Sequence, residues 1–340
     1  MKKALITGIT GQDGYYLTRL LLERGYEVHG LARRNSQMSL GTLEMLTPEE
    51  RAKVKIHWGD LLDYGFISQL IRMYRFDEVY HLAAQSFVGL SFENPHATFE
   101  INIGGTMNLA NAIKEYSQRT KLYFAATSEL YGKAEAIPQN ETTPFHPRSP
   151  YAVSKLAGFW TIKNYREAYN LFFVNGILFN HESKLRGPEF VTRKIASAVA
   201  RISRGAADPI RIGNLEAKRD WGFAGDYVEG MWLMLQQAEP DDYVLATGED
   251  HSVREFTEHA FKHVGIPLVW EGMGEEEVGK HAQTGAVLVT VDPAYFRPSE
   301  VDHLLGHAEK AKTVLGWKPK MSFEELVAHM MDAELERLDT

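Results

Sequence analysis

The stretch ALITGITGQDGYYLTRLLLERG (residues 4–25) decides the fold of this chain. A short apolar run comes first, then a turn with glycines at Gly8, Gly11 and Gly14, and then an amphipathic segment. Glycines at this spacing let the backbone turn sharply from a strand into a helix and approach a pyrophosphate, which then lies at the helix N-terminus. A plain strand–helix turn is the competing interpretation. The context on both sides of the motif favours dinucleotide binding.

The same alternation of strand and helix continues through the first 180 residues. Apolar runs predict strands at 3–7, 27–32, 53–59, 78–83, 121–127 and 172–178. Amphipathic stretches predict helices at 15–25, 65–75, 103–116 and 150–169. Alternation of this kind is typical of an α/β protein with a Rossmann-type, doubly wound parallel sheet.

After Asn180 the pattern changes, and longer helices dominate. Segments that predict helices are 190–205, 227–237, 253–265, 308–317 and 322–338, and segments that predict strands are 208–213 and 242–248. We expect residues 1–180 to form an NADP-binding Rossmann domain, which 225–250 rejoins. Residues 181–340 then form mainly a smaller, partly discontinuous substrate-binding domain, with the active site between the two.

The composition excludes several classes of protein. The chain has 340 residues, 44% of them apolar and 24% charged, as in ordinary globular proteins. Its net charge of -8 argues against a nucleic-acid partner, and it has no stretch that predicts a membrane span. It has no cysteine, and the apolar run after its basic start breaks at Gly8, too early for a secretory signal. We therefore expect a cytoplasmic protein.

The ends of the next strands suggest which dinucleotide binds. Arg33 and Arg34 follow the second strand, where an NAD-binding protein places an acid for the ribose 2′-hydroxyl. Two guanidinium groups suit a 2′-phosphate, so we expect NADP rather than two solvated arginines. The residues that we expect to contact the cofactor in this part of the chain are Gly8, Thr10, Gly11, Gln12, Asp13, Gly14, Arg33, Arg34, Asp60, Leu61, Leu82, Ala84 and Ser86.

Tyr151 and Lys155 are four residues apart on a predicted helix, and therefore on one face of it. A tyrosine is a poor base at neutral pH, but a nearby ammonium and an oxidised nicotinamide favour the phenolate and lower its pKa. The phenolate can then take a proton from a sugar hydroxyl while hydride leaves the same carbon. Thr127, at the end of the fifth predicted strand, can bond the same substrate oxygen, and Ser128 could serve instead.

Glu129 indicates a further step. Once a carbinol is oxidised to a ketone, the neighbouring C–H becomes acidic, and a carboxylate can remove that proton. The resulting acid can protonate a leaving hydroxyl one carbon further along, so that water is eliminated. A surface carboxylate that opens a loop is the competing interpretation.

These motifs together resemble the extended short-chain dehydrogenase/reductase superfamily, and within it the GDP-mannose 4,6-dehydratase family. The resemblance covers nearly the whole chain. The strings that carry it are GITGQDGYYL (8–17), TSELYGK (127–133), TPFHPRSPYAVSKL (143–156), NGILFNHES (175–183), RGPEFVTRKI (186–195), AKRDWGFAGDYVEGMWLMLQ (217–236), FRPSEVDHLLG (296–306) and LGWKPK (315–320).

The resemblance implies a lyase that converts GDP-mannose to GDP-4-keto-6-deoxymannose for deoxysugar biosynthesis. C4 is oxidised, water is lost across C5–C6, and hydride returns to C6, with NADP regenerated in each turnover. It also implies self-association into dimers or tetramers. We expect no metal, because the histidines and acids show no ligand spacing. The implied catalytic residues are Thr127, Glu129, Tyr151 and Lys155; Tyr151, Lys155, His181 and Arg186 would contact the cofactor; Ser86, Glu129, Asn180, Lys194, Arg219, Arg297 and Glu300 would contact the nucleotide sugar.

The charges of the second half agree with this. A GDP diphosphate needs cations, and Arg193, Lys194, Arg219 and Arg297 are candidates, although each taken singly is more often a solvated surface charge.

Some positions depart from the family pattern, namely Phe124, Ala126, Lys184, Ala97 and the stretch 100–108. They leave open a changed sugar pocket, such as one for GDP-manno-heptose. A nucleotide-sugar epimerase or reductase is a further alternative, although it has no use for a base at C5. A non-catalytic NADP-binding sensor is the last, although such proteins typically lose the tyrosine or the lysine.

Overall fold

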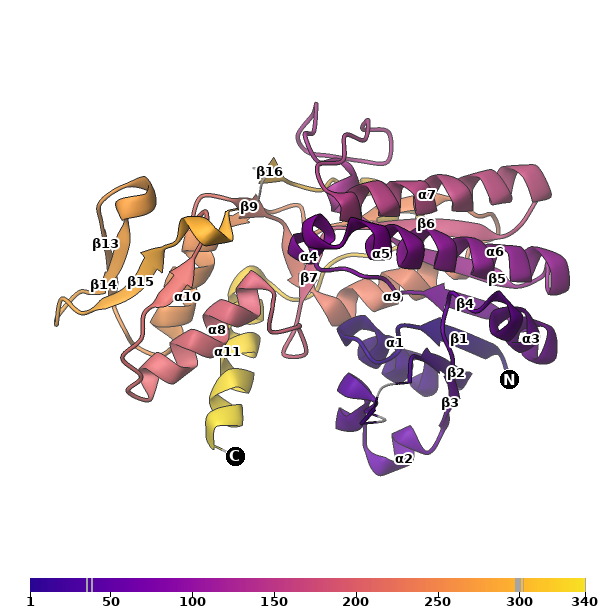
Figure 1. Cartoon of the computed structure of the whole chain (residues 1–340), viewed down its shortest axis with the longest axis horizontal. Coiled ribbons are helices and arrows are strands. Elements are labelled where there is room, and N and C mark those ends of the chain that lie inside the picture. The colour runs from indigo at the N-terminus through magenta and orange to yellow at the C-terminus, as the bar shows by residue number, and fades with distance from the viewer. Residues whose placement is uncertain (35, 38, 297–300, 302, 340) are drawn as a thin grey trace.

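A computed structural model of the chain describes residues 1–34, 36–37, 39–296, 301 and 303–339. A larger lobe surrounds a parallel sheet on the right of Figure 1, and a smaller lobe of helices and short strands lies on the left. Among the described residues, no helix is long and apolar enough to cross a membrane.

The larger lobe is built on a sheet of seven parallel strands in the described part of the chain, which confirms the predicted doubly wound fold. Their order is β11-β6-β5-β4-β1-β2-β3. From β1 the chain adds β2 and β3 on one side, and then β4, β5 and β6 on the other side, so the strand order reverses between β1 and β4. Ligands bind at such a switch point, beyond the carboxyl ends of the strands. The strands are β1 (Lys3–Thr7), β2 (Glu27–Ala32), β3 (Val54–Trp58), β4 (Glu78–His81), β5 (Lys121–Thr127), β6 (Phe173–Leu178) and β11 (Asp242–Leu245), which pairs with β6 from the second half of the chain.

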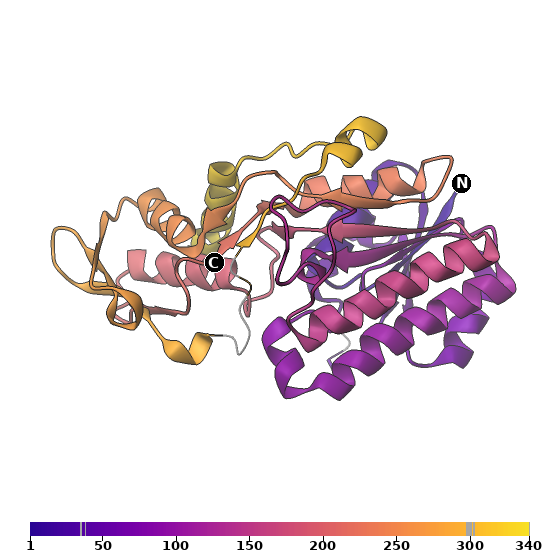
Figure 2. The same ribbon diagram turned by 90° about the horizontal axis from the view of Figure 1, so that it is seen from above.

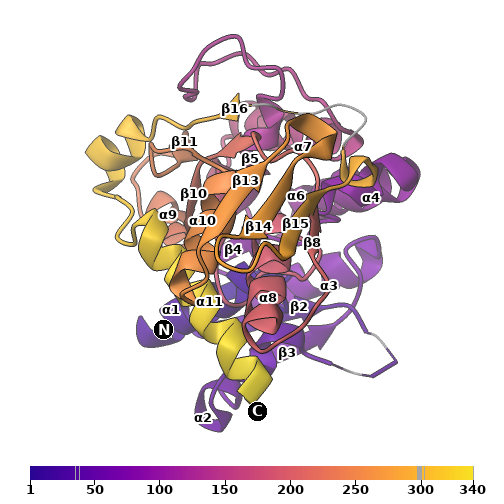
Figure 3. The ribbon, with the colours of Figure 1, turned by 90° about the vertical axis from the view of Figure 1, so that its left-hand side faces the viewer.

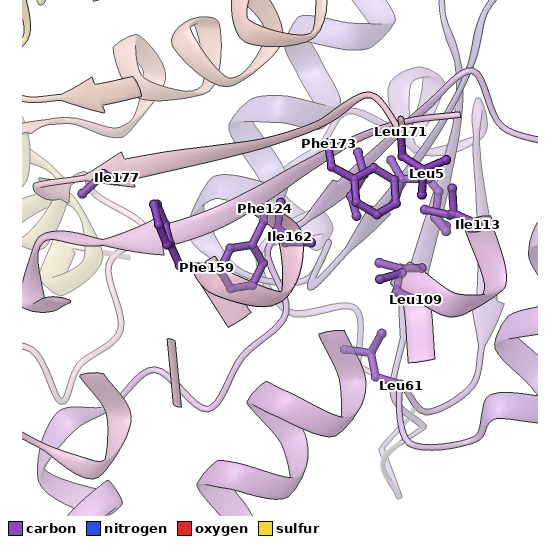
Figure 4. Packing of buried hydrophobic residues seen from close by; sticks show 14 of the residues in the cluster. Leu5, Leu61, Leu109, Ile113, Phe124, Phe159, Ile162, Leu171, Phe173 and Ile177 are labelled. Atoms are coloured by element: carbon purple, nitrogen blue, oxygen red, sulfur yellow. The ribbon is translucent and has the colours of Figure 1, made fainter. Parts of the chain in front are cut away.

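Helices cover both faces of this sheet (Figure 2). On one face lie α3 (Tyr64–Tyr74), α6 (Gly105–Tyr116) and α7 (Pro150–Tyr169), and on the other lie α1 (Gln12–Glu23) and α9 (Ala224–Leu235). Figure 4 shows Phe124 of β5 packed with Phe159 and Ile162 of α7. Each such side chain that is fully buried stabilises the fold by about 1.5–3 kcal/mol.

Short elements fill the connections of the larger lobe. The predicted 103–116 helix starts with a π-helical segment, η2 (Glu100–Gly104), before α6. No element was predicted at α4 (Val88–Glu93) and α5 (Pro95–Phe99), because Pro95 interrupts the pattern there and begins the second of these helices. The other short elements are η1 (Gly41–Met45), α2 (Pro48–Arg51) and η3 (Ser128–Leu130).

The smaller lobe packs three helices against a four-stranded sheet (Figure 3). The sequence predicted the helices and only one strand of that sheet, because the other strands are short and half exposed. The predicted 308–317 helix is mainly a π-helical turn, η6 (Ala311–Leu315). The elements of this lobe are α8 (Val191–Ser203), α10 (Val253–His263), α11 (Phe323–Asp339), β8 (Ile210–Ile212), β13 (Leu268–Glu271), β14 (Val278–His281), β15 (Val287–Val291), η4 (Gly274–Glu276) and η5 (Pro293–Tyr295).

Two small sheets join the lobes. β7 (Asn180–Glu182) follows β6 directly and pairs with β10 (Trp221–Phe223). This brings Asn180 and His181 to the carboxyl end of the large sheet. The other small sheet contains β9 (Lys218–Arg219), β12 (His251–Ser252) and β16 (His303–Leu304).

Candidate active site

A cavity of about 690 Å³ lies at the carboxyl ends of the large-sheet strands, at the switch point. This volume is typical of small-molecule sites. The predicted site residues that line it are Gly8, Thr10, Gly11, Gln12, Asp13, Gly14, Arg33, Asp60, Leu61, Leu82, Ala84, Ser86, Thr127, Glu129, Tyr151, Lys155, Asn180, His181 and Arg186.

Each of the three positions in the first turn favours glycine for a different structural reason. Gly8 has a φ of +71°, and a Cβ there would lie 2.8 Å from the backbone of Ala83. A Cβ on Gly14 would lie 2.3 Å from the carbonyl oxygen of Ile9. Gly11 differs, because its Cβ would meet only the carbonyl oxygen of Gly8, at 3.4 Å, and its bare backbone lines the cavity.

The start of α1 has the features of an anion site. Gly11 occupies the N-cap position and supplies no side-chain acceptor, so the first N–H groups of the helix stay available. Such groups bind phosphate oxygens together with the positive end of the helix dipole. This helix terminus and the bare backbone of Gly11 fit the pyrophosphate of a dinucleotide.

The first turn of α1 is also bound to β7. His181 Nε2 lies 2.9 Å from Asp13 Oδ2, while its Nδ1 lies 2.8 Å from the carbonyl oxygen of Phe179. Gln12 donates to the carbonyl oxygen of His181 and accepts from the Ser183 hydroxyl. Burial alone would lower the pKa of His181, but the Asp13 carboxylate outweighs burial and raises it. The dinucleotide turn and the loop after β7 therefore form one unit.

Thr127, Ser128 and Glu129 follow one another where β5 ends. Thr127 is the N-cap of the short helix η3, and its hydroxyl accepts from the backbone N–H of Glu129 at 3.2 Å. This bond fixes the turn. Glu129 is only 8% exposed and lines the cavity, so it is no surface carboxylate at the start of a loop.

Tyr151 and Lys155 are presented by the first turns of α7. The Ser149 hydroxyl caps this helix by accepting from the N–H of Ala152, and Pro150 occupies the first helical position. Both site residues are buried, and the ammonium of Lys155 lies 4.5 Å from the centre of the Phe124 ring. Thr127 and Tyr151 both line the cavity, where the Thr127 hydroxyl acts to lower the pKa of Tyr151, so the two segments meet there.

Burial changes the pKa values of both Tyr151 and Lys155 in the protein alone. Burial raises the pKa of Tyr151 to about 12, and the Thr127 hydroxyl opposes this only in part. Burial also lowers the pKa of Lys155 to about 7. The sequence did not indicate how strongly burial acts on the pKa of either group.

Asn102 is a supporting residue that the sequence did not single out. It is buried in the π-helical segment η2, where it accepts from the N–H of Gln85 at 2.8 Å and donates to the Ser154 hydroxyl at 2.9 Å. It therefore holds the 85–86 segment against α7 at Ser154, which lies between Tyr151 and Lys155 in the sequence. Widened helical turns of this kind often occur at functional sites. A lone amide in the apolar stretch 100–105 was the available signal.

Several predicted residues do not line this cavity. Arg34 is exposed beside it, and the Lys194 ammonium lies 3.3 Å from the centre of the Tyr295 ring. Arg219 is buried and donates to the carbonyl oxygen of Lys218. Arg193 binds Glu334. Arg297 and Glu300 lie outside the described residues.

In the part of the chain that the structure describes, no cluster of three or more His, Cys, Asp or Glu residues could hold a metal ion.

Comparison with known proteins identifies the family. The sequence profile of the family described as GDP-mannose 4,6 dehydratase matches residues 5–330. This chain belongs to the GDP-mannose 4,6-dehydratase family. It is 53% identical to the GDP-mannose 4,6 dehydratase of Cricetulus griseus, over 100% of this chain and 93% of the relative. It is also 53% identical to that of Homo sapiens, over 99% of this chain and 92% of the relative.

A solved structure shows the same architecture at greater distance. The UDP-glucose 4-epimerase of Thermus thermophilus, crystallised with NAD, superposes with a TM-score of 0.81 at 28% identity and covers 98% of each chain. This chain and the epimerase therefore share the large sheet and the smaller lobe.

Proposed function

We propose that this protein is a lyase that dehydrates GDP-mannose to GDP-4-keto-6-deoxymannose. The observation that carries the proposal is the meeting of Thr127 and Glu129, from the end of β5, with Tyr151 and Lys155 of α7 in one cavity. C4 oxidation requires a group that takes the hydroxyl proton, here Tyr151 with Lys155, and water loss requires an additional carboxylate, here Glu129. The relatives in Cricetulus griseus and Homo sapiens, both described as GDP-mannose 4,6 dehydratases, support it.

The cofactor in this proposal is NADP. When bound, its oxidised form would supply a positive ring that favours the Tyr151 phenolate and a carbon that takes hydride from C4 of the sugar and returns it to C6. The start of α1 would bind the pyrophosphate, and Arg33 at the end of β2 would bind the 2′-phosphate. The Thermus thermophilus epimerase, solved with NAD, supports a nicotinamide dinucleotide at this end of the sheet.

Tyr151 would handle the proton of the C4 hydroxyl. Its phenolate accepts that proton while hydride leaves C4, and the proton then passes to solvent. Thr127, which lines the same cavity as Tyr151, would orient the same oxygen. Lys155 would favour the phenolate through its charge.

Glu129 would turn this oxidation into a dehydration. The new C4 ketone acidifies the C5 proton, which Glu129 accepts. Glu129 then gives that proton to the C6 hydroxyl, which leaves as water and forms a C5–C6 double bond. Hydride adds to C6, and C5 takes a proton from solvent, which restores the atom balance of one lost water.

Substrate contacts complete the proposal. We place Ser86 and Asn180 at the sugar end, because both line the cavity. Lys194 and Arg219, beyond the cavity in and beside the smaller lobe, would bind the GDP diphosphate with Arg297. Glu300 would contact another part of the nucleotide sugar. This corresponds to a nucleotide-binding part formed by residues 1–180 with 225–250, and a mainly substrate-binding part formed by 181–340.

Self-association is also part of the proposal. Helices α6 and α7 lie side by side on the outside of the larger lobe (Figure 2) and expose Met107, Val153 and Trp160 there. Exposed apolar side chains on neighbouring helices favour a contact between two copies. Light scattering of the parent and of Trp160→Glu checks this, with a smaller particle expected for the variant.

Product mass tests the proposed reaction. The purified protein is incubated with NADP and GDP-mannose, and in parallel with GDP-manno-heptose. Loss of one water from GDP-mannose supports the proposal, and loss from the heptose substrate alone moves the function to a heptose dehydratase. An unchanged mass with an altered C4 configuration favours an epimerase, and NADP binding without turnover of either sugar favours a sensor.

A further inference from the structure

Glu334 of α11 does not line the cavity, yet two arginines connect it to a loop that does. Its side chain is 7% exposed. Arg193 of α8 donates from Nε to Glu334 Oε1 at 3.0 Å, and a terminal nitrogen of Arg337 donates to the same oxygen. One nearly buried carboxylate thus holds two guanidinium groups.

Each of these arginines has a second contact in the segment 183–190, here called the 183–190 loop. Arg193 donates from a terminal nitrogen to the carbonyl oxygen of Arg186 at 2.5 Å, and Arg337 donates to the carbonyl oxygen of Lys184. The planar guanidinium carries several donors in fixed directions, so it can bridge a carboxylate and a carbonyl oxygen at once.

The part of the 183–190 loop held in this way faces the cavity. Leu185, Arg186 and Gly187 line it, and so do Glu189 and Phe190. The Arg186 side chain is itself placed between two partners: Glu182, 3.0 Å from its Nε, and the Phe190 ring, 3.5 Å from its guanidinium carbon. Movement of the Arg186 backbone would therefore change the wall of the cavity.

The charge of Glu334 keeps the arginines together. Burial and the neighbouring charge of Arg193 lower the pKa of Arg337, with Glu334 opposing them. Without the carboxylate, two cations would face each other in a half-buried space, and the cheapest response is for them to separate into solvent. Both carbonyl contacts with the loop would then be lost.

We propose that Glu334 is a positioning residue that holds Arg193 and Arg337 so that they fix the 183–190 loop against the dinucleotide end of the cavity. Glu334 touches neither substrate nor cofactor, and it acts through the two arginines. The identity of the ligand as NADP rests on the proposed function, whereas the loop contact does not.

Glu334→Gln tests this with a matched control on the same helix. Asp339, at the C-terminal end of α11, pairs with Arg204, which follows α8, and both are more than half exposed with no contact to the loop among the described residues. Asp339→Asn therefore also removes a carboxylate from an α11–α8 ion pair. Amide hydrogen exchange of the unliganded proteins is measured over 183–190 and over β11 as a reference, and the Kd for NADP is measured by calorimetry.

For Glu334→Gln we expect faster exchange in the 183–190 loop, unchanged exchange in β11, and a Kd for NADP raised about 10-fold. The kcat at saturating substrate and cofactor should stay within about two-fold, because the reacting groups are elsewhere. Asp339→Asn should match the parent in every readout. If the parent binds no NADP, the proposed function fails, and loop exchange still tests the positioning role.

A second variant covers the case in which Glu334→Gln does not fold. Arg337→Lys keeps the charge but cannot bridge Glu334 and the Lys184 carbonyl in the same way, so it should show the loop effect in a weaker form. The proposal is overturned if a folded Glu334→Gln or Arg337→Lys protein exchanges its 183–190 amides like the parent. It is also overturned if exchange rises equally in β11, since that indicates a merely structural role.

Discussion

The cavity has two walls that are built by different physical means. The sheet wall consists of the strand ends of the large sheet, the glycine turn and the start of α7. The loop wall consists of His181 and the 183–190 loop. Strand register and close packing hold the sheet wall, as the 2.3 Å approach at Gly14 illustrates. Ion pairs hold the loop wall, among them Asp13 with His181 and Glu334 with its two arginines.

The two walls have different parts in our proposal, one mainly in the reaction and the other mainly in ligand binding. The groups that move protons in our proposal all belong to the sheet wall, whose geometry changes only if the core is repacked. The loop wall contributes charged groups whose contacts depend on pH and on single carboxylates. Changes to the reacting groups or the packing of the sheet wall should therefore affect kcat or folding, and changes to charged groups that face the ligand, or that hold such groups, should affect ligand affinity.

The largest effect is expected from the sheet wall. Tyr151→Phe removes the hydroxyl that accepts the C4 proton, and we expect kcat to fall about 10³-fold. The Kd for NADP should change by only a few-fold, because the ring keeps its packing. Steady-state rates and calorimetric titration check this. A Tyr151→Phe protein with substantial turnover would mean that another group takes the proton.

The next effect is on folding. Gly14→Ala places a methyl group against the Ile9 carbonyl oxygen and should lower the free energy of unfolding by about 2–4 kcal/mol. Gly104→Ala is the control, because a Cβ there makes an ordinary 3.4 Å contact with the Leu62 side chain. Urea midpoints measure both. Equal stability of the two variants would refute the packing account of the glycine turn.

At the contact between the glycine turn and the loop wall, Asp13→Asn should destabilise the protein by about 1–2 kcal/mol in a limited pH range. The pKa of His181 is raised, so its contribution is complete below its ordinary value of 6.5 and is lost as pH rises through the folded pKa. The pKa of Asp13 is lowered, so its contribution is present above 3.8 and is lost as pH falls through the folded pKa. The difference in the free energy of unfolding between parent and variant should thus be largest between pH 3.8 and pH 6.5, the ordinary pKa values of the two groups.

Urea midpoints of parent and Asp13→Asn at about pH 5.5 and about pH 9 measure this gap. It should narrow at the higher pH. A gap that is constant across this range would show that the carboxylate acts by shape or by a neutral hydrogen bond rather than as the partner of a protonated imidazole.

The smallest effects concern the choice between NADP and NAD. They are tested by changing Arg33, which lines the cavity, and its neighbour Arg34, which does not. Arg33→Ala should raise the Kd for NADP about 10-fold and leave the Kd for NAD nearly unchanged, because it removes a cation from the 2′-phosphate. Arg34→Ala should stay within about two-fold, since Arg34 does not line the cavity. If Arg33→Ala binds NADP like the parent, Arg33 does not select the cofactor.

The sheet wall could be predicted from the sequence because its information is local. The bounds of β2, β5 and α7 agree with the apolar patterns to the residue, and the glycine turn and the Tyr151–Lys155 pair lie within short strings. Side chains at adjacent strand ends meet because parallel strands end on one edge, so the sequence alone was enough to place Glu129 and Tyr151 together.

The loop wall could not be predicted, because its contacts join distant parts of the chain. Glu334 is 141 residues from Arg193, and the Lys184 carbonyl is 153 residues from Arg337. No spacing or periodicity indicates such pairs, so the sequence offered Arg193 as a candidate for the diphosphate. In the structure it binds Glu334 and the Arg186 carbonyl oxygen and does not line the cavity. The strands β13, β14 and β15 were missed for a related reason, since half-exposed four- or five-residue strands bury too little to pattern the sequence.

The central claim is that Glu129 converts a reversible oxidation into loss of water. Its most direct test is a single turnover of Glu129→Gln with NADP and GDP-mannose in D₂O, followed by NADPH absorbance and product mass. The account predicts that NADPH forms and accumulates, while no product lacking one water appears and no deuterium enters C5. Formation of the dehydrated, C5-deuterated product at the rate of the parent would contradict it.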